Sequence, residues 1–153
     1  MSVMKTLSRA TLLEQKFSEC YDLMSQKASE PSLAADLQKL SREEIYHANL
    51  IKSGEKILNV SSDLVKEMKT SHLEIDTGIS KLNNLLESLK NNTIELKEAI
   101  KAIYDLEMVF EKVHMDKVVE FEEPSLKQLF RALADGDKIH RERLELIMNT
   151  FRS

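Results

Sequence analysis

Two stretches of the chain decide the fold: residues 30–47, which read EPSLAADLQKLSREEIYH, and residues 123–140, which read EPSLKQLFRALADGDKIH. Both begin with Glu-Pro-Ser-Leu, and both end with a carboxylate followed three residues later by histidine. Proline is favoured in the first turn of a helix because its missing N–H would have no partner there. Each stretch therefore predicts a helix that starts beside its proline and carries the carboxylate and the histidine on one face.

The segments before these two stretches also match when the sequence is shifted by 93 residues, the shift that aligns 30–47 with 123–140. An aliphatic, acidic and aromatic triplet occurs in each copy, as Leu13, Glu14 and Phe17 and as Leu106, Glu107 and Phe110. One offset without a gap therefore aligns both the helix starts and the polar residues. We interpret the chain as a duplicated helical hairpin whose two copies are related by a pseudo-twofold axis.

Apolar side chains recur at steps of three and four along four long segments, a spacing that places them on one stripe of an α-helix. The predicted helices cover 5–28, 32–57, 93–121 and 125–151. Only short turns join the first helix to the second and the third to the fourth. Each pair is therefore expected to form an antiparallel hairpin.

The connection between the two hairpins is much longer than these turns. It is expected to contain helical pieces near 62–70 and 78–90, separated by polar residues around 71–77. A connection of this length can run the whole height of a bundle. The sequence therefore predicts an all-α, four-helix bundle built from two repeated hairpins with one long crossover. The predicted parts of this single domain, residues 1–153, are a hairpin, a crossover and a second hairpin: 5–57, 58–92 and 93–151.

Composition argues against several classes of protein. Three Gly and two Pro are too few for the turns of a β-rich fold, and no run approaches the ~18 apolar residues that a membrane span requires. The first residues lack the apolar core of a secretion signal, so we expect a cytoplasmic protein. A net charge of −4 without a basic stretch argues against nucleic acid as a partner. The single cysteine, Cys20, excludes an intramolecular disulfide and is expected to be a small buried hydrophobe.

Six polar residues interrupt the apolar stripes of the four predicted helices: Glu14, Glu44, His47, Glu107, Asp137 and His140. Burying unpaired carboxylates is costly, and Lys117 is the only Lys or Arg on these stripes. Two divalent cations would neutralise the four carboxylates while both imidazoles stay neutral. One Glu from each of two helices, with a carboxylate-x-x-His from each of the other two, is the ligand set of di-iron carboxylate bundles. Oxygen and nitrogen ligands without sulfur suit iron or manganese, and zinc is also compatible.

In these residues the sequence resembles the rubrerythrin-like branch of the ferritin-like superfamily. The family pattern is a Glu, an aromatic residue, a Pro and then Leu-Ala-x-x-Glu-x-x-His, and its two copies here cover about 6–57 and 94–151. The matching residues are Glu14, Phe17, Tyr21, Pro31 and 40–47 in the first copy, and Glu107, Phe110, Pro124 and 133–140 in the second. Asp137 stands where the family has Glu, and Phe110 stands where rubrerythrins proper carry an additional Glu. The rubredoxin-like iron module is absent.

The resemblance implies a ferritin-like fold with two iron ions. The implied ligand roles are one iron held by Glu14 and His47, the other held by Glu107 and His140, and a bridge formed by Glu44 and Asp137. It further implies an oxidoreductase that reduces hydrogen peroxide or dioxygen with electrons from an external donor. Bundles of this kind often pair, so a homodimer is one expected assembly.

Several alternatives remain open from the sequence. The chain could bind and oxidise ferrous ion for storage or sensing without turnover, or it could be a metal-free structural bundle whose protonated carboxyls hydrogen-bond to the histidines. Tyr21 and His114 lie at equivalent positions, two turns after the first acidic residue of each copy. Each could support a ligand through a hydrogen bond or could simply pack in the core. Glu43, Asp135 and Glu111 are expected to be exposed charges, one of which could orient a histidine.

Overall fold

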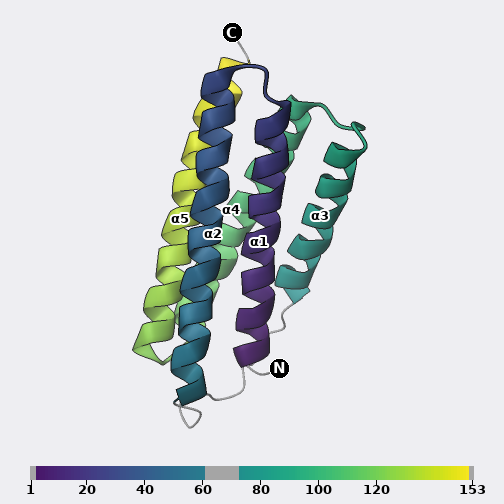
Figure 1. The fold of residues 1–153 in the computed structure, drawn as a ribbon. Coiled ribbons are helices and arrows are strands. Elements are labelled where there is room, and N and C mark those ends of the chain that lie inside the picture. The colour runs from purple at the N-terminus through teal and green to yellow at the C-terminus, as the bar shows by residue number, and fades with distance from the viewer. Residues whose placement is uncertain (1–2, 61–72, 152–153) are drawn as a thin grey trace.

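The structure is a computed structural model that describes residues 3–60 and 73–151, and these residues form five α-helices and no strand (Figure 1). The helices are α1 (Val3–Lys27), α2 (Pro31–Val60), α3 (Leu73–Lys90), α4 (Leu96–Glu120) and α5 (Pro124–Thr150). Successive helices run in opposite directions, with the N-terminus at one end of the molecule and the C-terminus at the other. The prediction of an all-α protein is confirmed for the described part of the chain.

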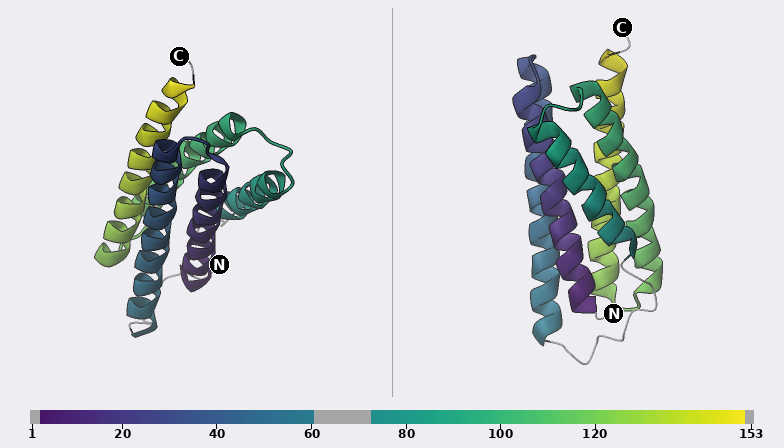
Figure 2. Two further views of the ribbon diagram at one scale, coloured as in Figure 1. Left: turned by 45° about the horizontal axis from the view of Figure 1, so that its top comes forward. Right: turned by 90° about the vertical axis from the view of Figure 1, so that its right-hand side faces the viewer.

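The helices pack as two hairpins, α1 with α2 and α4 with α5. The hairpins face each other through α1 against α4 and α2 against α5, so that four of the helices form a bundle. The fifth helix, α3, lies against the outer side of α1 and α4 and, within the described residues, contacts neither α2 nor α5 (Figure 2). Because α3 runs back along the bundle, α2 and α4 point in the same direction.

The structure corrects the expected form of the connection between the hairpins. Helix α3 begins at Leu73, so residues 73–77 are helical and not the polar interruption predicted around 71–77. The buried residues of α3 explain its length, since they follow one helical stripe: Ile75, Ile79, Leu82, Leu86 and Leu89. Two acidic residues in its first turn also favour a helix N-terminus there, and Asp76 pairs with Arg9 of α1 at 2.6 Å. The helical piece predicted near 62–70 lies outside the described residues.

Asn92 explains why α4 begins at Leu96 and not at the predicted residue 93. This residue has a left-handed backbone, with φ of 55°, and it follows the end of α3. The Thr93 N–H donates to the Ser88 carbonyl at 3.0 Å and the Asn92 N–H to the Leu89 carbonyl at 3.3 Å, the pattern of a Schellman cap. The residues after α3 therefore satisfy the carbonyls of that helix before a new helix can start.

The two repeated prolines are the first residues of α2 and α5, close to the predicted helix starts. Before Pro124, the Glu123 side chain caps α5 by accepting a hydrogen bond of 2.8 Å from the Leu126 N–H. These starts set the register of both helices, and the carboxylate and histidine of each copy follow three to four turns later, at mid-bundle.

The core consists mainly of apolar side chains, and all six predicted polar residues are buried in it. Phe17 and Phe110, equivalent residues of the two copies, meet edge to face with ring centroids 6.1 Å apart. Helix α3 packs closely on Phe110, because a Cβ at Gly78 would overlap the Phe110 ring. None of the described helices has the length and apolar character needed to cross a membrane.

Candidate metal centre

All six residues predicted as ligands are buried inside the bundle. Glu14 comes from α1 and Glu107 from α4, while α2 and α5 each supply a carboxylate and a histidine. The three Glu side chains are 0 % exposed, and the most exposed member, His47, is only 7 % exposed. The interruptions in the apolar stripes therefore do face the interior, as the sequence predicted.

Three groups of side chains bring metal-ligating atoms within 4.8 Å of one another. The groups are Glu14 with Glu44 and His47, Glu44 with Glu107 and His140, and Glu14 with His114 and Asp137. Because Glu14 and Glu44 each belong to two groups, the three groups form one continuous cluster. Buried acidic and histidine side chains of this kind could hold metal ions.

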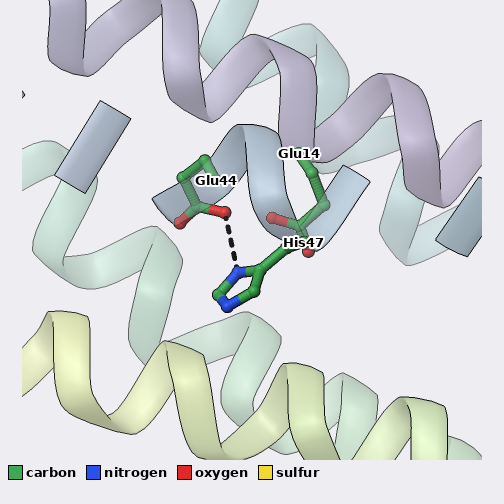
Figure 3. A group of neighbouring side chains, drawn as sticks. All are labelled: Glu14, Glu44 and His47. Carbon is green, nitrogen blue, oxygen red and sulfur yellow. Dashed lines mark hydrogen bonds and ion pairs between the residues drawn. The ribbon is translucent and has the colours of Figure 1, made fainter. Parts of the chain in front are cut away.

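Figure 3 shows the first group, which joins α1 to α2. The Nδ1 atom of His47 lies 3.3 Å from Oε2 of Glu44, one helical turn earlier on α2. The carboxylate of Glu14 approaches from α1, and neither of its oxygens has a hydrogen-bond partner. The group thus offers carboxylate oxygens that the protein itself leaves unpaired.

Gly136 of α5 makes room for His47. A Cβ at Gly136 would overlap the His47 imidazole at its Cε1 and Nε2 atoms. Only the absence of a side chain lets α5 approach this ring so closely. Gly136 therefore has a packing role at the site, although glycine in a helix interior lowers helix stability.

The second group joins α2, α4 and α5 through His140. Its Nδ1 lies 2.7 Å from Glu44 Oε1 and 3.2 Å from Glu107 Oε1. Its Nε2 lies 2.7 Å from Glu43 Oε2, on the outer side of the cluster. Tyr21 of α1 completes the group by donating a hydrogen bond of 2.7 Å to Glu107 Oε1. Of the two roles left open for Tyr21, hydrogen bonding to a candidate ligand is the one observed.

The third group contains a residue that was not among the six predicted ligands. The Nδ1 atom of His114 lies 2.5 Å from Asp137 Oδ2, and its Nε2 lies 3.9 Å from Glu14 Oε1. The other Asp137 oxygen, Oδ1, has no hydrogen-bond partner. The sequence identified His114 as the counterpart of Tyr21, but residue spacing did not predict its contact with Asp137.

Burial sets the protonation of the cluster. Desolvation, followed by the charges of neighbouring carboxylates, raises the pKa of Glu14 and of Asp137 well above their ordinary values. The same two causes raise the pKa of Glu107 to about 7. Burial lowers the pKa of His114 to about 3, so this imidazole stays neutral. A neutral imidazole is the form that binds metal.

Glu44 and His140 behave differently because they face each other. Burial opposes ionisation of both groups, but the paired charges outweigh it and lower the pKa of Glu44 while raising that of His140. Without a metal, Glu44 and His140 therefore form an ion pair at the centre of the cluster, surrounded by protonated carboxyls.

The unpaired atoms test whether a cation fits this cluster. Five buried atoms in the described residues have no hydrogen-bond partner: both carboxylate oxygens of Glu14, Oε2 of Glu107, Oδ1 of Asp137 and Nε2 of His114. Buried polar atoms nearly always have partners. All five atoms here belong to the three groups, and four of them are carboxylate oxygens. A bound cation would satisfy them together, so the residues present fit a metal ion.

The remaining candidate residues occupy supporting or unrelated positions. Cys20 is buried, as expected, and its thiol contacts the Leu82 carbonyl at 3.7 Å. Lys117 is also buried, with its ammonium 3.3 Å from Glu120 Oε2. Glu111 binds Arg141 at 2.8 Å. Of the three charges expected to be exposed, only Asp135 is; Glu43 and Glu111 are half-buried because they pair with residues of α5, and Glu43 contacts His140.

Comparison with protein-family models, with curated proteins and with solved structures found no match. The described geometry supports a buried site for metal ions made from oxygen and nitrogen ligands.

Proposed function

We propose that this protein is a non-haem di-iron carboxylate protein with a ferritin-like bundle, related to the rubrerythrin-like branch. It would act as an oxidoreductase that reduces hydrogen peroxide or dioxygen with electrons from an external donor. The observation that carries the proposal is the set of four carboxylates and two histidines, buried on four helices, with carboxylate oxygens left unpaired. Iron is favoured over magnesium or calcium because the set includes imidazole nitrogen.

The ligand roles follow the two copies of the repeat. One metal position would use Glu14 and His47, and the other would use Glu107 and His140. Glu44 supports a role between the two positions, because it belongs to the groups that contain each histidine. Asp137 remains the proposed counterpart of Glu44, although one of its oxygens is held by His114.

Two ferrous ions, when bound, supply two electrons together to an oxidant such as hydrogen peroxide. The chain's own residues orient the ligands and exclude water. Tyr21 holds one oxygen of Glu107, and Glu43 holds the outer nitrogen of His140. Phe110 closes the side facing α3, and Phe17 packs against the Phe110 ring. Because Phe110 stands at the position of the additional Glu of rubrerythrins proper, any proton transfer here must use other groups.

A metal-free structural bundle is the second candidate, and one observation favours it. Each of the three buried histidines already lies within hydrogen-bond distance of a carboxylate, as protonated carboxyls and imidazoles would in a metal-free core. Against it stands His114 Nε2, a buried nitrogen without a hydrogen-bond partner in the described residues, whereas the unpaired oxygens of Glu14 and Asp137 can pair with neighbouring carboxylates once protonated.

Metal content after anaerobic loading with ferrous ion decides between the two candidates. We expect two iron ions per chain in the wild-type protein and fewer in the variants His47→Ala and Glu107→Ala. Glu111→Ala is the matched control, because Glu111 lies one turn from Glu107 on α4 but contacts Arg141 and, within the described part of the chain, no residue of the cluster. Iron content that is equal in all four proteins would contradict the proposed ligands.

Turnover of hydrogen peroxide with an added reductant then separates catalysis from iron storage or sensing. A loaded protein that consumes peroxide repeatedly supports the oxidoreductase. A protein that oxidises its ferrous ions once and then stops would be an iron-handling protein that uses the same ligands.

A further inference from the structure

We propose that His114 is a further metal ligand, binding through Nε2 next to Glu14, so that the two metal positions are chemically unequal. This inference rests on the proposed function, since it assigns an additional ligand to the same site. It changes the expected ligand set from six residues to seven.

The first observation is the departure from symmetry between the two copies. Tyr21 and His114 occupy equivalent positions, and each reaches across the bundle toward the first acidic residue of the other copy. The Tyr21 hydroxyl ends in a hydrogen bond of 2.7 Å to Glu107. His114 Nε2 lies 3.9 Å from Glu14 Oε1, a distance too long for a hydrogen bond. The second copy thus replaces a hydroxyl donor with an imidazole nitrogen that is not hydrogen-bonded.

The second observation is that both facing atoms are buried and unpaired. His114 and Glu14 are each 0 % exposed, and neither His114 Nε2 nor Glu14 Oε1 has a hydrogen-bond partner. Metal bonds to nitrogen and carboxylate oxygen are about 2.0–2.2 Å long, so two ligands of one ion lie roughly 3–4 Å apart. The observed separation of 3.9 Å falls in this range.

The third observation concerns the other ring nitrogen. A histidine that binds a metal almost always has its second nitrogen held by a carboxylate, a carbonyl or water. In His114, Nδ1 lies 2.5 Å from Asp137 Oδ2, and the same arrangement holds the outer nitrogen of His140 against Glu43. Asp137 therefore acts as a positioning residue for His114 through one oxygen, while its unpaired Oδ1 can still bind a metal.

Packing alone does not explain an imidazole at this position. The ring lies between Phe110 and Phe130, with centroids 5.9 Å from each. A third phenyl ring would suit these apolar neighbours without burying an unpaired nitrogen. The two aromatic rings instead hold the imidazole in one place, as a ligand requires.

The test counts histidine ligands directly in the protein loaded with Co²⁺. The chain has four histidines. In protein labelled with ¹⁵N in histidine, each ring bound to paramagnetic cobalt gives a strongly shifted N–H signal in the NMR spectrum. We expect three shifted rings in the wild-type protein and two in His114→Tyr, which installs the residue of the equivalent position. His114→Gln is a second variant with the same expectation. Glu111→Ala is the control and should keep three, because Glu111 contacts Arg141 and, among the residues described, no ligand of the cluster.

Stepwise titration with Co²⁺ provides a second readout. Loss of a residue that merely orients a ligand already costs about 10–100-fold in metal affinity. We therefore expect at least a tenfold loss in one of the two binding steps of His114→Tyr, and no such loss in Glu111→Ala, because Glu111 contacts Arg141 and none of the described ligands of the cluster.

The possible failures are distinguishable. A wild-type protein that binds two cobalt ions with only two shifted histidines would overturn the role of His114 and leave the proposed di-metal site intact. Three shifted histidines that persist in His114→Tyr would do the same. A wild-type protein that binds no cobalt would overturn both this inference and the proposed function.

Discussion

Glu43 of α2 holds the outer nitrogen of His140 on α5, with 2.7 Å between Glu43 Oε2 and His140 Nε2. The hydrogen bond from His140 lowers the pKa of Glu43 to about 2, and Arg143 adds a second contact of 2.9 Å. The residue equivalent to Glu43 in the other copy is Gly136, which lies against His47. The two copies therefore differ around their histidines: a carboxylate contacts His140, and a glycine backbone packs closely against His47.

Glu43→Ala should weaken metal binding without removing a ligand. Because the outer nitrogen of His140 loses its acceptor, we expect affinity to fall by about 10–100-fold. The number of ions bound at saturation should stay unchanged. The measurement is a metal titration monitored by absorbance or calorimetry.

Glu111→Ala is the matched control for this change. Glu111 is similarly half-buried and also accepts from an arginine, Arg141, but it has no contact with a histidine of the cluster among the hydrogen bonds of the described residues. An equal loss of affinity in both variants would show that surface charge, and not orientation of His140, matters.

Gly136→Ala should disturb the site through His47. The added Cβ would overlap the imidazole, so the ring must rotate away from Glu44 or α5 must move outward. We expect a loss of metal affinity at the position that uses His47, even though Ala favours a helix by about 1 kcal/mol relative to Gly.

Gly54→Ala provides the comparison for Gly136→Ala. Its added Cβ would lie 3.0 Å from Leu129 Cδ2, the end of a flexible side chain, and the helix gains the same propensity. Metal affinity should be unchanged in this variant. If Gly136→Ala binds metal as tightly as the wild-type protein, close packing of α5 on His47 has no role in the site.

The metal-free protein should lose stability between about pH 6.5 and 8. The pKa of Glu107 is raised to about 7 and those of Glu14 and Asp137 are also raised, so each favours the folded state at low pH and loses that contribution as pH rises. The raised pKa of His140 also lowers the stability of the folded state as the pH rises above 6.5, the ordinary pKa of histidine. Urea unfolding of chelator-treated protein at the two pH values measures the difference.

Two groups of the cluster have lowered pKa values, which affect stability in the opposite direction, but both act below pH 6.5. The lowered pKa of His114 destabilises the fold only below 6.5, and the lowered pKa of Glu44 matters only under more acidic conditions. With metal present the trend should reverse, since ligation needs deprotonated carboxylates and neutral imidazoles. Metal-free stability that rises from pH 6.5 to 8 would contradict protonated carboxyls in the core.

Tyr21→Phe should destabilise the metal-free protein. The change removes the hydroxyl that donates to Glu107 and leaves that buried carboxyl with one partner fewer. We expect the free energy of unfolding to fall by about 1–2 kcal/mol. Tyr46→Phe is the control, because Tyr46 is 62 % exposed, and its change should stay within about 0.5 kcal/mol. Equal effects in both variants would mean that the Tyr21 hydroxyl contributes nothing specific.

The sequence by itself determined the helices of the bundle and the burial of its polar residues. Helical periodicity is a property of neighbouring residues, so Glu14 and Glu107 could be placed on apolar stripes without knowing what they face. The duplication predicted two equivalent hairpins, because a single offset aligns His47 with His140. Where local order was ambiguous, as at residues 73–77, the expected helix started too late.

Only the tertiary structure decided which atoms meet inside the bundle. The rotation of α4 against α5 brings His114 onto Asp137, and the closeness of α5 to α2 puts Gly136 against His47. Both depend on how helices from distant parts of the chain rotate and slide against each other, which a repeat of three and four residues leaves undetermined. Two copies that look alike in sequence therefore surround their histidines with different partners.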